Sequence, residues 1–131
     1  MRGMHSSTTA YDGTLAFRVY TNGSVENNLN SYGQISDVSL KENIVDANSQ
    51  WSDIKSVKVR NFNFKEGQTH KQIGVIAQEI ENVSPGLVYE TGDNLKGVTY
   101  SVLYMKAIKA LQEAMDRIEA LETKVAALEA A

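Results

Sequence analysis

The sequence predicts an α+β protein, in which a small antiparallel sheet with short helices precedes a long C-terminal helix that forms a parallel coiled coil. Three observations lead to this prediction. Short segments of alternating apolar and polar residues lie between turn residues, one short amphipathic segment ends at Ser84-Pro85-Gly86, and residues 101–131 contain neither Gly nor Pro. A chain of 131 residues of which 42% are hydrophobic can hold one modest domain, but hardly two independent ones.

The N-terminal part of the chain predicts a β-hairpin followed by a linker. Residues Leu15–Val25 alternate apolar and polar side chains around an Asn22-Gly23 pair, which is typical of a strand and a tight turn. Residues Glu26–Gly33 are rich in Asn, Ser and Gly and predict an exposed linker. Residues 1–7 are interpreted as an internal start or a vector remnant and are left out of the fold prediction.

The composition changes sharply at Ile35, where a segment of alternating character and rising charge begins. We therefore predict a boundary at the Ile35-Ser36 bond, with residues 1–35 forming one part of the chain and residues 36–131 the other.

The middle of the chain predicts the small sheet and its helix. Val57–Phe64 strictly alternates β-branched or aromatic residues with polar ones, as a half-buried strand does. Ile73–Val83 predicts a helix with Val75, Ile76, Ile80 and Val83 on one face. Leu87–Tyr89 and Lys96–Tyr100 predict short strands on either side of a turn at Thr91–Asn94. We expect Trp51, Ile54 and Val57 in the core, and Tyr100 and Tyr104 between the long helix and the sheet.

The C-terminal helix carries a heptad repeat over about residues 103–131, and we expect it to leave the globular body near Met115. Taking Leu111, Ile118 and Val125 as a positions puts Arg117 and Lys124 at g and Glu122 and Glu129 at e. In a parallel assembly Arg117 then meets Glu122, and Lys124 meets Glu129, of a neighbouring helix. The seam residues recur at alternating spacings of four and three: Ala107, Leu111, Ala114, Ile118, Leu121, Val125 and Leu128.

The composition of the chain excludes or disfavours several classes of function. A net charge of -3 and the lack of a Lys/Arg block argue against a nucleic-acid partner. The absence of cysteine excludes disulfides and thiol nucleophiles, and no carboxylate pair stands at metal-ligand spacing from a histidine, so we predict no metal and no cofactor. No apolar run is long enough for a membrane span, and we expect a soluble protein of the cytoplasm.

One segment has the composition of a catalytic site. Ser36-Asp37-Val38-Ser39-Leu40-Lys41 places a hydroxyl five residues before an amine, and Ser and Lys can act as nucleophile and base without histidine. The lysine can accept the serine proton only if desolvation lowers its pKa, so this interpretation requires a buried Lys41. The alternative from the spacing alone is a surface serine and lysine at the start of a strand.

Several motifs in the same order carry a resemblance to a known family. These are SDVSLKENI, a strand ending FNF, IGVIAQEIENVSPGLV, GVTYSVL and the heptad helix, which together cover Ser36 to about Leu128. The chain resembles the intramolecular chaperone auto-processing domain of bacteriophage tail spikes, tail fibres and neck appendages. This domain is also found in membrane-bound transcription factors related to myelin regulatory factor.

The resemblance implies a homotrimer that assists the folding of an upstream fibre or spike stalk and then cuts itself off. The family serine and lysine correspond to Ser36 and Lys41, which makes Ile35-Ser36 the scissile bond of a self-cleaving serine endopeptidase with a Ser-Lys dyad. Residues 1–35 are then the end of the stalk and the folding client. The domain would act in the host cytoplasm during virion assembly, after which the fibre enters the virion tail and the chaperone domain is released.

Other interpretations remain open at this stage. The chain could be a purely structural trimerisation module with an inert Ser36 and Lys41, whereas a transcription-factor fragment is disfavoured by the acidic charge. His70 could replace Lys41 as the base, but a solvated loop histidine is the preferred interpretation. Gln78 and Glu79 are interpreted as capping or subunit-contact residues rather than catalytic ones.

Overall fold

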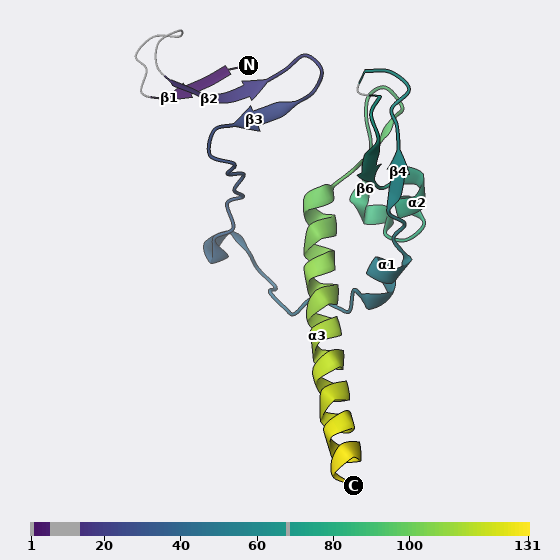
Figure 1. Ribbon diagram of the computed structural model, residues 1–131. Coiled ribbons are helices and arrows are strands. Elements are labelled where there is room, and N and C mark those ends of the chain that lie inside the picture. The colour runs from purple at the N-terminus through teal and green to yellow at the C-terminus, as the bar shows by residue number, and fades with distance from the viewer. Residues whose placement is uncertain (1, 6–13, 68) are drawn as a thin grey trace. The chain divides into compact units, whose positions relative to one another are not determined.

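The computed structural model describes residues 2–5, 14–67 and 69–131 of the chain. The chain divides into two compact units, Met1–Ile44 and Val45–Ala131 (Figure 1). Each unit has its own secondary structure, and the two are described separately.

The N-terminal unit contains a three-stranded antiparallel sheet in the order β1-β2-β3. Its strands are β1 (Arg2–His5), β2 (Thr14–Val19) and β3 (Val25–Asn27). The predicted turn between β2 and β3 is confirmed: Gly23 has a φ of 89°, which glycine adopts without steric cost. The short 3-10 helix η1 (Val38–Leu40) follows in an extended, exposed segment.

Two predictions for this unit need correction. Arg2–His5, which the fold prediction left out, pairs with β2 in the sheet, while Met1, Ser6 and Ser7 lie outside the described residues. The predicted linker begins later than Glu26, because Glu26 and Asn27 pair with Arg18 and Phe17 in β3.

The C-terminal unit is α+β, as predicted, but its strands form two separate two-stranded antiparallel sheets, β4-β5 and β6-β7, rather than one. Each strand is only three residues long. The elements are α1 (Trp51–Ser56), β4 (Arg60–Phe62), β5 (Gln72–Gly74), α2 (Ala77–Glu81), η2 (Pro85–Leu87), β6 (Val88–Glu90), β7 (Lys96–Val98) and α3 (Tyr100–Ala130).

The predicted helix over Ile73–Val83 is wrong in its first half. Ile73 lies in β5 opposite Asn61, and its side chain is 74% exposed. A short apolar run fits both the helical and the strand period, and here pairing with β4 decides between them. The glycine at position 74 suits this pairing, because a Cβ there would lie 3.2 Å from the Phe62 ring and from the Tyr100 hydroxyl.

The core of this unit is small and lies where α2, η2 and the start of α3 meet. Ile80, Leu87 and Leu103 are 1%, 3% and 8% exposed. Ile54 and Val57 pack against this core, as predicted, and Trp51 is half-buried. Additional partly buried residues complete the cluster: Val75, Val88 and Val98.

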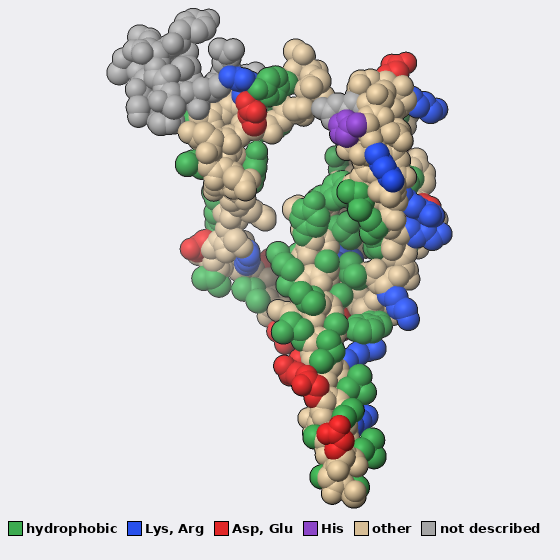
Figure 2. All heavy atoms as spheres, in the orientation of Figure 1, with side chains coloured by type: hydrophobic (Ala, Val, Ile, Leu, Met, Phe, Trp, Pro, Cys, Tyr) green, Lys and Arg blue, Asp and Glu red, His purple; other side chains and the backbone are tan. Residues whose placement is uncertain are grey.

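The predicted long C-terminal helix is present as α3, and its contacts with α1 and the residue before it reach as far as Arg117. Asp53 pairs with Lys106 at 3.1 Å, the Gln50 backbone N–H donates to Glu113 at 2.9 Å, and the Arg117 guanidinium lies 3.6 Å from the centre of the Trp51 ring. Tyr104, which we expected to be packed, is 62% exposed. Hydrophobic side chains run along the visible face of α3 towards its C-terminal end (Figure 2).

The C-terminal half of α3 exposes the predicted heptad seam. Its hydrophobic residues are all at least half exposed in the single chain: Ile118, Leu121, Val125 and Leu128. None of the helices among the described residues is both long and apolar enough to cross a bilayer.

Candidate functional site

The segment Ser36–Lys41 forms a tight, locally hydrogen-bonded turn. Asp37 is the N-cap of η1, and its Oδ1 accepts hydrogen bonds from the backbone N–H of Ser39 at 2.8 Å and from the Ser39 hydroxyl at 2.5 Å. The N–H of Leu40 donates to the carbonyl of Asp37, and that of Lys41 to the carbonyl of Val38, each at 3.1 Å. Aspartate at an N-cap satisfies donors that the helix itself leaves unpaired, which is why this sequence turns here.

The turn brings together the two residues that the sequence singled out. The Lys41 ammonium group Nζ donates a hydrogen bond to Oγ of Ser36. A hydroxyl in contact with an amine is the arrangement that a serine nucleophile with a lysine base requires, once the amine is unprotonated and can accept the proton. The geometry of the pair therefore fits acyl transfer to Ser36.

The burial of the pair does not fit the sequence-based requirement. Ser36 and Lys41 are both exposed, and Ile35, on the other side of the candidate scissile bond, is 82% exposed. The expectation of a buried Lys41 is therefore wrong for the single chain. The reason is that residues 36–44 lie in an exposed segment, whose side chains are exposed throughout.

Asp37 differs electrostatically from a free carboxylate. The hydrogen bond from the Ser39 hydroxyl, and then the one from the Ser39 backbone, lower its pKa below the usual 3.8. Hydrogen bonds to the charged form favour ionisation, so the side chain is a carboxylate at neutral pH. Sequence reasoning passed over Asp37 and Ser39, although Asp followed two residues later by Ser is a recognisable local capping signal.

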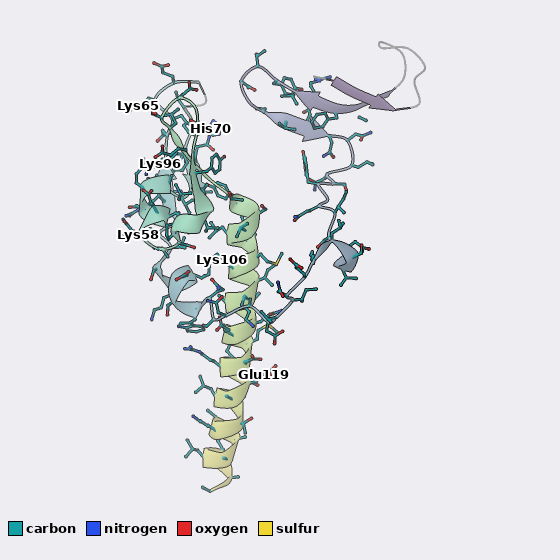
Figure 3. All side chains as sticks on the ribbon, turned by 180° about the vertical axis from the view of Figure 1, so that it is seen from behind. Lys58, Lys65, His70, Lys96, Lys106 and Glu119 are labelled. Atoms are coloured by element: carbon teal, nitrogen blue, oxygen red, sulfur yellow. The ribbon has the colours of Figure 1, made fainter. Side chains whose placement is uncertain are left out.

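The other candidates have structural contacts of their own. Glu79, in the first turn of α2, forms a two-point ion pair with Arg60 of β4, with the closer contact at 2.7 Å. This hydrogen bonding lowers the pKa of Glu79. His70 lies in the loop between β4 and β5 (Figure 3), where it is exposed and its Nε2 is 2.7 Å from the Gln72 amide nitrogen. Glu79 thus joins a helix to a strand, and His70 is a solvated loop residue, as predicted.

A second network was missed because its partners are far apart in sequence. Gln50 is 7% exposed, its side-chain amide donates to Asn48, and its backbone donates to Glu113 of α3. Hydrogen bonds from the Ser49 hydroxyl and from the Gln50 backbone lower the pKa of Glu113. Together with the Trp51–Arg117 stack, this network attaches α1 to α3.

The segment around the turn is also rich in exposed hydrophobic residues. Exposed apolar residues recur along this segment of the N-terminal unit: Ile35, Val38, Leu40 and Ile44.

Comparison with known proteins relates the sequence of this segment to a family. Residues 36–89 match the family described as chaperone of endosialidase, Peptidase_S74, and the match begins at Ser36. This match supports an intramolecular chaperone domain of the type found in phage tail proteins.

The chain is also similar to a protein named "Probable tail fiber protein" from Escherichia phage Phieco32. The two are 30% identical over 134 residues, which cover 96% of this chain and 18% of that protein. The chain thus spans less than a fifth of the length of the curated relative that it matches.

Proposed function

We propose that this chain is a C-terminal intramolecular chaperone that forms a trimer, assists the folding of an upstream tail fibre or spike stalk, and then releases itself by cleavage at Ile35-Ser36. The observation that carries the proposal is the hydrogen bond between Lys41 and Ser36 at the start of the family match. The proposed domain boundary follows from it, with residues 1–35 as the end of the stalk and residues 36–131 as the chaperone.

The proposed reaction is a self-acylation followed by hydrolysis. The Ser36 hydroxyl oxygen attacks the carbonyl carbon of Ile35, while unprotonated Lys41 takes the hydroxyl proton. The bond between the Ile35 carbon and the Ser36 nitrogen then breaks, and the proton passes to the new amine. Water hydrolyses the resulting ester, which yields the carboxylate of Ile35 and restores the hydroxyl of Ser36. Because nucleophile and scissile bond share one residue, proximity supplies much of the rate.

We propose that assembly of several chains buries Lys41, which is exposed in the single chain. Lys41 is exposed in one chain, whereas a base of this kind needs a site that excludes water. Neighbouring chains would cover the exposed hydrophobic residues of the Ile35–Ile44 segment and thereby desolvate Lys41. Cleavage would then occur only after correct assembly.

The heptad seam of α3 supports a parallel coiled coil, and the number three comes from the family resemblance. Arg117 already stacks on Trp51 of its own chain, so Lys124 with Glu129 is the pair that we expect to set the parallel direction. Such exposed pairs contribute only about 0.2–1 kcal/mol each, so they select orientation, while the hydrophobic seam supplies most of the affinity.

The client is proposed to be the stalk of which the β1-β2-β3 sheet is the last part. If the stalk chains are intertwined, each chain pairs non-locally with its neighbours, and such a topology is slow to nucleate. A trimeric module at the C-terminus would raise the effective concentration of the three stalks to roughly millimolar. We place this step in the host cytoplasm during virion assembly, after which the fibre enters the virion tail.

Mass spectrometry of the purified chain tests the proposal. We expect release of residues 1–35, and loss of that release in Ser36→Ala and in Lys41→Ala. Matched controls are Ser31→Ala, a nearby exposed serine, and Lys65→Ala, an exposed lysine of the β4-β5 loop; both should cleave normally. A wild-type chain that assembles as a trimer and stays intact would contradict the protease function.

That last outcome would favour the second candidate, a purely structural trimerisation module. The exposure of Lys41 is the observation on its side, because a solvated lysine is a poor base. In such a module Ser36→Ala and Lys41→Ala would leave both the chain length and the oligomeric state unchanged.

A further inference from the structure

We infer that Asp37 is a positioning residue for the Ser36–Lys41 pair, acting through its two hydrogen bonds to Ser39. This inference rests on the proposed self-cleavage and adds to it the side chain that holds nucleophile and base together. Asp37 touches neither the scissile carbonyl nor the Lys41 amine in any recorded hydrogen bond among the described residues, so its role is to shape the turn.

The geometry shows why a turn is required. Five residues in an extended chain span roughly 17 Å, which is beyond the reach of a lysine side chain. The η1 turn shortens this path, and Asp37 is the residue at which it starts. One carboxylate oxygen, Oδ1, accepts hydrogen bonds from both the backbone N–H and the hydroxyl of Ser39, and these two bonds stabilise the centre of the turn.

The hydrogen bonds of Asp37 matter because the turn is not packed against other residues of the chain. Val38 and Leu40, the apolar residues of η1, are exposed, so packing does not hold the turn in a single chain. Within the described parts of the chain, the hydrogen bonds recorded for residues 36–41 are all made inside this segment. Local capping is therefore what keeps Lys41 next to Ser36 before any other chain covers them.

Asp37 contributes both a negative charge and a hydrogen-bond acceptor to the turn, and a substitution can separate these two contributions. The hydrogen bonds that lower the pKa of Asp37 are donated by Ser39 and accepted by Oδ1 of Asp37. An asparagine side chain has the same acceptor oxygen. Asp37→Asn should thus keep the shape of the turn and remove the charge, which separates positioning from electrostatics.

The test uses the full chain, synthesised in a cell-free system, with the release of residues 1–35 followed over time. We expect Asp37→Ala to slow release about tenfold, a size typical of losing an N-cap, and Ser39→Ala to slow it about two- to threefold, because the backbone bond remains. Asp37→Asn should restore a rate close to that of the wild type. Ser31→Ala, an exposed residue outside the turn, is the control, and native mass spectrometry must show that every variant still assembles.

The dependence of the release rate on pH distinguishes a positioning role of Asp37 from an electrostatic one. If Asp37 is a positioning residue, Asp37→Asn keeps the pH of half-maximal release at its wild-type value. Asp37→Ala lowers the maximal release rate and leaves that pH unchanged. A displaced pH of half-maximal release in Asp37→Asn would assign Asp37 an electrostatic role instead and overturn the inference.

The outcomes also separate this inference from the proposed function. If Ser36→Ala and Lys41→Ala block release while Asp37→Ala cleaves at the wild-type rate, self-cleavage stands and the positioning role is overturned. If the wild-type chain releases nothing after assembly, the proposed function fails and the positioning role fails with it.

Discussion

The turn at Ser36–Lys41 and the core around Ile80 are held by opposite means. The core residues Ile80, Leu87 and Leu103 come from three elements and are almost completely buried, so hydrophobic packing defines their positions. The turn is exposed, its apolar residues face solvent, and hydrogen bonds between neighbours in sequence define its shape. The buried core is thus made by residues of one chain, whereas the candidate site has a locally defined shape and is exposed in that chain.

The largest expected effect comes from separating the chains while leaving each one folded. The double substitution Ile118→Asp and Leu121→Asp places two charges on the exposed seam, in a part of α3 that lies beyond the last recorded contact with α1. Burying these charges between helices is unfavourable, so we expect loss of the proposed trimer, measured by light scattering, and a fall of at least tenfold in the proposed release of residues 1–35.

Ala120→Asp is the matched control for this prediction, because Ala120 is exposed and lies off the seam. It should assemble and cleave normally. Cleavage at the wild-type rate by a monomeric double variant would show that the turn needs no cover from other chains.

The second-largest effect is expected for the core around Ile80. Ile80→Ala removes the most deeply buried side chain of the core, and large-to-small substitutions at such positions cost about 2–5 kcal/mol in the free energy of unfolding. Urea denaturation followed by circular dichroism measures this loss. Ile73→Ala, at an exposed position of β5, should cost much less. Similar losses for both variants would mean that Ile73 is buried in the assembly.

The smallest effect concerns the attachment of α1 to α3. Because hydrogen bonds lower the pKa of Glu113 below the usual 4.5, its ionised form stabilises the folded chain above about pH 4.5, and this contribution is lost as the pH falls through the lowered pKa. We expect Glu113→Gln to decrease the melting temperature slightly at pH 7, and the difference from wild type to shrink at pH 3.

Thermal unfolding at the two pH values measures this effect, with Glu119→Gln as the control. Glu119 lies on the exposed part of α3 (Figure 3), and its substitution should give no comparable difference between the two pH values. A difference from wild type in Glu113→Gln that grows on acidification would contradict the assigned role.

Predictions from local patterns were the most accurate. The Asn22-Gly23 turn forms because glycine tolerates the required positive φ, and the helix over residues 100–130 forms because its sequence contains good helix formers and no Gly or Pro. The hydrogen bond between Ser36 and Lys41 is also local, and the turn that makes it possible is encoded by its own capping residue. Such features depend on residues a few positions apart, which a sequence displays directly.

The features that sequence analysis missed depend on residues far apart in the chain. Ile73 pairs with Asn61 instead of continuing a helix, Glu113 caps the backbone of Gln50, and Arg117 stacks on Trp51 instead of remaining available at the seam. The exposure of Lys41 belongs to the same group, because burial depends on what packs over a side chain and not on its neighbours in sequence. The sequence by itself thus determined the class of fold and the long helix, and the family resemblance singled out Ser36 and Lys41, which the structure joins by a hydrogen bond. Only the tertiary structure decided which apolar residues are buried and which stay exposed, because burial is settled by packing between distant segments.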